Sequence, residues 1–180
     1  PSITVDTACS TSLVATHLAV QSLQNHECNA AICTAANVLL DPYISICYSR
    51  SNLLSDYGRC RFGAEDAKGY VRCEGSAAIL LKRLSDAERD GNHIYAIIPG
   101  TACNNDGQSD KYMLAPSAIT QTALIRKALH NASIDNRDVQ YIEAHGTGTN
   151  AGDPIELSSI PGALEQGRTS EQRYYVGSAK

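Results

Sequence analysis

The sequence lacks any apolar run of the ~18 residues that a membrane-spanning helix needs, and it has no block of charges of one sign. Charged residues make up 19% of the chain and sum to a net charge of −4. The sequence therefore predicts neither nucleic acid nor a membrane as a partner. It begins at Pro1, without the basic, apolar and small-residue regions of a signal peptide, so we expect an N-terminus that has been cut.

The seven cysteines form no C-x-x-C motif and show no paired spacing. An odd number without pairing argues against a secreted disulfide framework, and the missing motif argues against a zinc ribbon or a thioredoxin-type site. We therefore expect a cytoplasmic protein without a metal. Apart from Cys9, the cysteines are predicted to be small buried apolar residues.

With 180 residues, of which 43% are hydrophobic, the chain suits about one domain with a real core. Strands are expected at residues 2–5, 30–36, 77–81, 94–98, 140–144 and 174–176, and helices at 9–24, 42–49, 85–90, 117–130 and from 153 onward. This alternation predicts an α/β domain with buried sheets and no internal boundary. The helix at 9–24 is apolar nearly all round, which is typical of a buried helix. Asp41, followed by Pro42, and Ser117 are expected to cap the helices at 42–49 and 117–130.

Cys9 lies where the first predicted strand turns into this helix, within the segment VDTACSTSL at residues 5–13. Backbone N–H groups and the helix dipole at such a position favour negative charge, lower the pKa of a thiol and can stabilise an oxyanion. This is the arrangement that a nucleophilic cysteine needs. The alternative is a structural cysteine packed at the junction, which free cysteines more often are.

His145 follows another predicted strand and stands in the glycine-rich turn EAHGTGT at residues 143–149. Glycines let a ligand approach the backbone, and the hydroxyls of Thr147 and Thr149 can donate and accept hydrogen bonds. Neutral imidazole suits proton transfer, or polarising a carbonyl, near pH 7. A turn histidine without a chemical task is the equal alternative.

The spacing Gly146-x-Gly148-x-x-Ala151 also imitates a dinucleotide-binding fingerprint, so a nucleotide-binding module is a rival from another class. The acid expected about twenty residues later on a second strand is not evident. The sequence contains neither the G-x-S-x-G of hydrolases nor a P-loop. Residues 104–107 imitate a calcium loop but lack its closing glutamate.

Together these segments resemble the β-ketoacyl synthase family, specifically the ketosynthase domain of type I polyketide synthases. VDTACSTSL is similar to the nucleophile motif, EAHGTGT to the first histidine motif, GDPIE at residues 152–156 to its continuation, and GSAK at 177–180 to the start of the lysine motif. Residues 69–75 and 81–87 are also similar to family segments. The matches run in family order over essentially the whole chain.

The resemblance implies a thiolase-like fold, layered α-β-α-β-α, and a homodimer. The family domain is more than twice this length. Residues 1–180 are therefore expected to be a partial, incomplete ketosynthase domain, from the nucleophile-cysteine motif to the lysine motif. The second catalytic histidine would follow Lys180, and the fragment alone is expected to be inactive.

The activity implied by the resemblance is decarboxylative Claisen condensation in polyketide or fatty-acid biosynthesis. Cys9 would take an acyl group from the phosphopantetheine of an acyl carrier protein, and a malonyl-type extender would then lose carbon dioxide and attack it. His145 matches the histidine that assists decarboxylation, and Lys180 the lysine that orients the histidines. No cofactor is expected to be bound by the domain itself.

Four further positions are carried over from the same motifs. Thr147 and Thr149 match residues that contact the pantetheine arm. Asp153 and Glu156 match acids near the lysine. Both could also cap the helix that they begin, since an acid three residues after a cap is typical of a capping box, and the two roles are compatible.

Three departures from the family pattern put the subfamily in question. Ala64 replaces the usual acid after the phenylalanine of residues 60–64, Cys73 stands where glycine or serine is common, and residues 110–114 look about one residue longer. Two rivals keep the fold but not the activity: a thiolase-fold domain that binds or decarboxylates acyl chains without elongating them, and a non-catalytic scaffold.

Overall fold

The computed structural model describes residues 1–107 and 115–180, and the contacts within it define two compact units. The first unit comprises Pro1–Leu39 and Cys73–Cys103, and the second comprises Leu40–Arg72 and Asn104–Lys180. The segment of residues 110–114, which was expected to be about one residue longer than in the family pattern, lies outside the described part.

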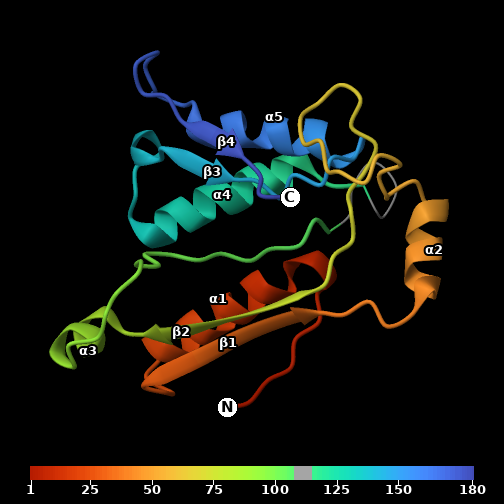
Figure 1. Ribbon diagram of the computed structural model, residues 1–180. Helices are drawn as coiled ribbons and strands as arrows, with labels where there is room; N and C mark the ends of the chain where they lie inside the picture. Colours follow the sequence, from red (N-terminus) through yellow and green to blue (C-terminus); the bar gives the residue numbers. More distant parts are fainter. Residues whose placement is uncertain (108–114) are drawn as a thin grey trace. The chain divides into compact units, whose positions relative to one another are not determined.

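The first unit is a helix packed on an antiparallel pair of strands (Figure 1). A 3-10 turn, η1 (Ala8–Ser10), leads into α1 (Thr11–Gln24), followed by β1 (Ala30–Asn37), β2 (Gly75–Lys82) and α3 (Leu84–Arg89). β1 and β2 pair antiparallel, in a register that places Ile32 opposite Leu80. α1 covers one face of this pair, where the thiol of Cys33 donates to the carbonyl of Ala15. The predicted helix and both predicted strands are thus confirmed.

The prediction that α1 is buried on all sides is wrong. Only Val20, Ser22 and Leu23 are buried, and Leu13 is 74% exposed. The sheet is likewise open on the face away from α1, where the opposed pair Ile32 and Leu80 is 72% and 69% exposed. These side chains are exposed because the described residues of this unit cover only one face of α1 and one face of the sheet.

Two predicted strands, at residues 2–5 and 94–98, are not formed. Their β-branched composition suits a strand, but a strand forms only where a neighbour takes its backbone N–H and C=O groups. No ladder to either segment exists among the described residues. Both segments are extended and largely exposed, with Tyr95 at 94%.

All seven cysteines are free, as expected, but the prediction that six of them are buried holds only for Cys33. Cys73 is exposed and the other four are partly exposed. A small apolar side chain is buried only where other elements cover it, and these two units do not supply that cover at the remaining positions.

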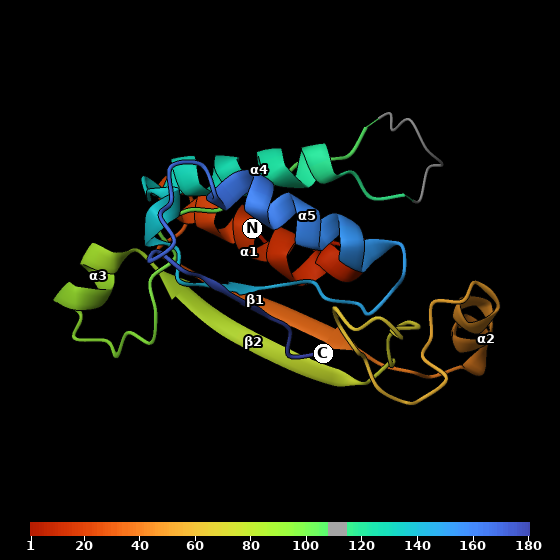
Figure 2. The same cartoon turned by 90° about the horizontal axis from the view of Figure 1, so that it is seen from above.

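The second unit packs two helices against a small parallel sheet. It contains α2 (Pro42–Arg50), α4 (Ala118–Ala132), η2 (Asn136–Asp138), β3 (Tyr141–Glu143), α5 (Gly152–Leu164) and β4 (Tyr175–Gly177). β3 and β4 pair in parallel, and α4 and α5 lie side by side in both views (Figures 1 and 2). The core joins three buried residues of α5 to partly buried neighbours from α4, β3, β4 and their flanks: Ile160, Ala163, Leu164, Ile125, Leu129, Val139, Ile142, Tyr174 and Val176.

Side-chain caps begin α2 and α4 as the sequence predicts. The carboxylate of Asp41 accepts from the backbone N–H of Tyr43 at 2.6 Å, with Pro42 at the first helical position. The hydroxyl of Ser117 accepts from the N–H of Thr120.

Throughout the described ranges, no helix has the length and apolarity to cross a membrane.

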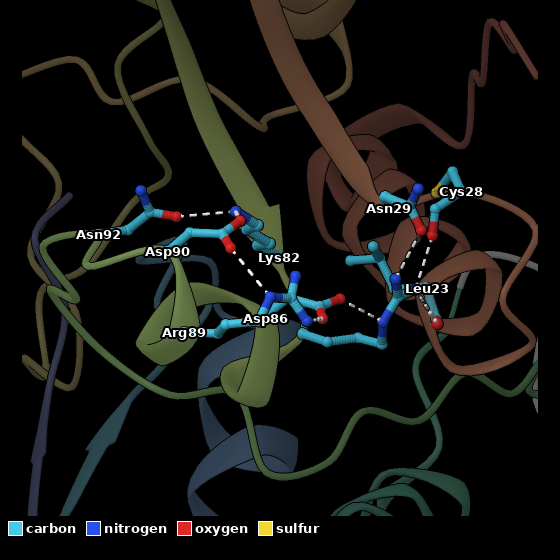
Figure 3. A network of polar contacts seen from close by, with 9 residues as sticks. Leu23, Cys28, Asn29, Lys82, Asp86, Arg89, Asp90 and Asn92 are labelled. Carbon is cyan, nitrogen blue, oxygen red and sulfur yellow. Dashed lines mark hydrogen bonds and ion pairs between the residues drawn. The ribbon is translucent and has the colours of Figure 1, made fainter.

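Arg83 joins three separate stretches of the first unit through Leu23, Cys28, Asn29 and Asp86, which Figure 3 labels. Its guanidinium donates to the carbonyls of Leu23 and Cys28 at 3.0 and 2.7 Å, to the side chain of Asn29 at 2.7 Å, and to the carboxylate of Asp86 at 2.7 Å. The end of α1, the start of β1 and the start of α3 are therefore held by a single side chain that is only 19% exposed.

Replacing this side chain, Arg83→Ala, is expected to lower the free energy of unfolding by about 2–3 kcal/mol, because charged hydrogen bonds are lost and two carbonyls lose their donor. Urea unfolding followed by circular dichroism measures the loss. Arg89 also pairs with Asp86, but its side chain is 66% exposed, so Arg89→Ala should have a much smaller effect. Equal losses in the two variants would contradict this assignment.

Candidate active site

Cys9 lies in the 3-10 turn that directly precedes α1, and it is exposed. Ala8, immediately before it, has a φ of +55°, which is a left-handed conformation that costs a residue with a side chain about 1–2 kcal/mol. The strained turn is held by Thr11, whose hydroxyl donates to the Ala8 carbonyl at 2.7 Å and accepts from the Thr7 N–H at 2.9 Å. Cys9 is thus fixed at the positive end of a helix and reachable from solvent.

His145 follows β3 in a turn that the first turns of α5 hold in place. The Ala144 N–H donates to the Gly177 carbonyl at 2.8 Å, which extends the pairing of β3 with β4 up to the histidine. The carboxylate of Glu156 then accepts from the N–H groups of His145 and Gly146, at 2.6 and 2.9 Å. The backbone of His145 is therefore fixed on both sides.

Asp153 and Glu156 do not cap α5, so the capping prediction is wrong. The N-cap residue is Ala151, without a side-chain cap bond. The carboxylate of Asp153 instead accepts from the N–H groups of Gly148 and Gly63, both at 3.0 Å, and Asp153 is buried. The two acids bind the backbone of neighbouring loops because glycines bring those loops within reach of the helix.

Thr147 and Thr149 face each other across the same turn. Their hydroxyl oxygens lie 3.0 Å apart, and that of Thr149 also accepts from the Gly152 N–H at 3.1 Å. Both residues are partly exposed, so their hydroxyls remain within reach of a ligand. The pair offers donors and acceptors beside His145, as the sequence suggested.

Lys180 lies beyond β4, close enough to His145 for its charge to act on the imidazole. Next to it, the Ala179 N–H donates to the carboxylate of Glu143 at 2.6 Å. The hydroxyl of Tyr141 donates to the same carboxylate at 2.6 Å, which lowers the pKa of Glu143 and raises that of Tyr141. Glu143 therefore stays ionised and ties the chain before Lys180 to β3.

The surroundings lower the pKa of His145 below its usual value near 6.5. His145 as a whole is exposed, but the first cause is the partial removal of water from its ring by the surrounding chain, and the second is the positive charge of Lys180. The carboxylates of Glu156 and Asp153 act in the opposite direction without outweighing these two. The imidazole is consequently neutral at pH 7, with a nitrogen that can donate a hydrogen bond.

We expect an NMR titration of the His145 ring to give a pKa below 6.5. Because the folded state disfavours the charged form, the stability linked to this group is complete above pH 6.5 and falls as the pH drops toward the folded pKa. Lys180→Met should raise the pKa of His145, since it removes a positive charge that disfavours the imidazolium. A pKa at or above 6.5 in the unaltered chain would contradict this description.

The structure brings six of the seven predicted site residues together in the second unit: His145, Thr147, Thr149, Asp153, Glu156 and Lys180. Cys9 belongs to the first unit. The sequence analysis missed Phe62 and Ser178, both of which lie against Gly146. No spacing rule connects residue 62 with residue 146, so only the fold could reveal this contact. In the part of the chain that is described, no three His, Cys, Asp or Glu side chains group as metal ligands.

Two family models match the chain. Residues 1–87 match the N-terminal domain of β-ketoacyl synthases, and residues 95–180 match their C-terminal domain. Among curated proteins, the chain is 46% identical over its whole length to one component of the phenolphthiocerol/phthiocerol polyketide synthase of Mycobacterium tuberculosis H37Rv, of which it covers 10%. It is 50% identical over 163 residues, 89% of the chain, to probable polyketide synthase 1 of Dictyostelium discoideum, of which it covers 5%.

Solved ketosynthases have the same fold. The oxazolomycin ketosynthase domain OzmH KS7 of Streptomyces albus JA3453 is 39% identical, with a TM-score of 0.94 over 99% of this chain. The ketosynthase from module 6 of the bacillaene synthase of Bacillus subtilis 168 is 40% identical, with a TM-score of 0.92 over 97%. The chain spans 31% of each of these two structures, which explains why its helices and strands are so widely exposed.

Proposed function

Because the chain belongs to the β-ketoacyl synthase family and has the thiolase-like α/β fold of ketosynthase domains, we propose that it carries the condensing site of such an enzyme. The reaction is transfer of an acyl group to Cys9 and its decarboxylative Claisen condensation with a malonyl-type extender. One observation carries the proposal: a neutral imidazole, His145, is fixed by its backbone beside two threonine hydroxyls and a lysine.

Cys9 acts as the nucleophile. Its thiol loses a proton, and the sulfur attacks the carbonyl of an acyl thioester on the phosphopantetheine of an acyl carrier protein. The C–S bond to phosphopantetheine breaks, and the departing thiolate takes up a proton in place of the one that Cys9 lost. The positive end of α1 stabilises the oxyanion of the tetrahedral intermediate. The acyl group is then held on Cys9 as a new thioester.

His145 acts on the extender. Loss of carbon dioxide from a malonyl thioester leaves an enolate, whose oxygen accepts a hydrogen bond from the neutral imidazole. The enolate carbon attacks the acyl-Cys9 carbonyl, the C–S bond breaks, and the Cys9 thiolate is regenerated with the β-ketoacyl chain on the carrier protein. Lys180 keeps His145 neutral through its charge, and Thr147 and Thr149 hydrogen-bond the pantetheine arm.

We further propose that residues 1–180 are part of one ketosynthase domain of a homodimeric polyketide or fatty-acid synthase in the cytoplasm. Its partner is an acyl carrier protein, and its substrates arrive as thioesters on that carrier. The polyketide synthase relatives support this setting.

The test needs a complete domain, because the chain spans 31% of the ketosynthases that it matches. In a hybrid ketosynthase, these 180 residues replace the matching segment of the bacillaene module 6 enzyme. With acyl and malonyl carrier proteins, we expect mass spectrometry to detect the β-ketoacyl product on the carrier. Carbon dioxide release without that product would favour the non-elongating alternative. The absence of both carbon dioxide release and product would refute the proposed function.

A further inference from the structure

Phe62 lies against the turn that carries His145, although it comes from a distant part of the sequence. A Cβ placed at Gly146 would lie 3.0 Å from Cγ of Phe62 and 2.5 Å from both side-chain atoms of Ser178. Gly146 has a φ of +53° and is buried. The space where a side chain of the residue after His145 would lie is therefore filled by the Phe62 ring and Ser178 together.

The segment around Phe62 is fastened to the same turn by its backbone. One carboxylate oxygen of Asp153 accepts from the Gly63 N–H, and the other accepts from the Gly148 N–H, both at 3.0 Å. Six residues further on, the Gly69 N–H donates to the Gly148 carbonyl at 2.7 Å. Residues 62–69 are thus bound to the histidine turn at both of their ends.

The loop that presents Phe62 is closed at its base. The Tyr70 N–H donates to the Leu53 carbonyl, and the Ser55 N–H donates to the Tyr70 carbonyl, both at 3.0 Å. The ends of residues 53–70 consequently lie together, while Phe62 near the middle reaches the turn. A closed loop with fixed ends holds its middle more firmly than an open one, since less chain entropy opposes the contact.

From this geometry we propose that Phe62 is a positioning residue for His145, and that the loop of residues 53–70 serves to hold its ring against Gly146. The inference rests on the proposed function, because it concerns the same histidine. Phe62 does not act on substrate. It prevents the Gly146 peptide from rotating, and so fixes the direction in which the imidazole points. A misplacement of about 1 Å in a catalytic group can cost on the order of 10²-fold in rate.

The first experiment uses the 180-residue chain itself and needs no activity. The Phe62 ring packs on Gly146, the neighbour of His145, and the charged groups that act on the imidazole are Lys180, Glu156 and Asp153. Phe62→Ala should admit water and raise the pKa of His145 toward 6.5 in an NMR titration, whereas Phe62→Tyr should retain the pKa of the unaltered chain.

The second experiment measures condensation in the hybrid ketosynthase. Phe62→Ala should lower kcat by roughly 10- to 100-fold, with KM for the malonyl carrier protein changed by less than about 3-fold, because the loss affects the reacting geometry and not binding. Phe62→Tyr should restore most of kcat. Tyr57→Ala is the matched control, since Tyr57 lies in the same loop, is 58% exposed and stacks under Lys68.

The outcomes separate this inference from the proposed function. If the unaltered hybrid elongates and Phe62→Ala elongates equally well with an unchanged His145 pKa, the positioning role is wrong and the function stands. If Phe62→Ala and Tyr57→Ala lose kcat alike, the effect belongs to loop stability and the positioning role is also wrong. If the unaltered hybrid forms no β-ketoacyl product, the proposed function fails and this inference fails with it.

Discussion

Replacing Cys9 with alanine should abolish the covalent acyl-enzyme. In the hybrid ketosynthase, incubation with an acyl carrier-protein thioester is expected to add the mass of one acyl group to the unaltered protein. The mass of the Cys9→Ala variant should not change. Condensation should fall by at least about 10³-fold, because without a thiolate at the start of α1 no side chain accepts the acyl group.

Cys73 provides the matched control for this variant. It is the other exposed cysteine of the chain, and it belongs to the same unit as Cys9. Unlike Cys9, it does not precede a helix. Cys73→Ala should therefore be acylated and elongate normally. Acylation that persists in Cys9→Ala, or that maps to Cys73, would contradict the role of Cys9.

Replacing His145 with alanine should separate the two half-reactions. Condensation is expected to fall by about 10²–10⁴-fold, since the enolate loses its hydrogen-bond donor. Acylation of Cys9 should persist, because Cys9 and the turn and helix that hold it belong to the first unit, whereas His145 belongs to the second. Measuring the acyl-enzyme by intact-protein mass spectrometry, beside the β-ketoacyl product on the carrier, resolves the two steps.

His130 serves as the comparison for His145. It belongs to the same unit, is exposed, and lies in the last turn of α4, outside the glycine-rich turn. His130→Ala should leave both half-reactions unchanged. If His145→Ala elongates at the normal rate, the imidazole has no part in the condensation. If it can no longer be acylated, the division of roles between Cys9 and His145 is wrong.

Local sequence signals were sufficient for the elements that form from short-range contacts. Asp41-Pro42 and Ser117 predicted the starts of α2 and α4, because a capping side chain and the N–H that it accepts are two or three residues apart. The resemblance placed His145, Thr147 and Thr149 in one turn, and the structure gives them one turn.

Signals that depend on distant partners failed for physical reasons. The segments at 2–5 and 94–98 have the composition of strands but no neighbour to pair with in the described chain, and α1 has apolar faces that these units leave open. Asp153 and Glu156 were expected to cap their own helix, whereas glycine backbones of other loops compete successfully for their carboxylates. Phe62 stood out only as the phenylalanine of a family pattern, and nothing connected it with Gly146, which it contacts but which is far away in the sequence.

The central claim is that one acyl group passes through Cys9 and leaves it as part of a β-ketoacyl chain. A pulse-chase experiment on the hybrid ketosynthase tests this directly. The protein is loaded with an isotope-labelled acyl group, freed of excess thioester, and chased with malonyl carrier protein. We predict that the label leaves Cys9 and appears on the carrier as the β-ketoacyl product, with carbon dioxide released in equal amount. Label that stays on Cys9, or that is released as free acid without reaching the carrier, would contradict the account.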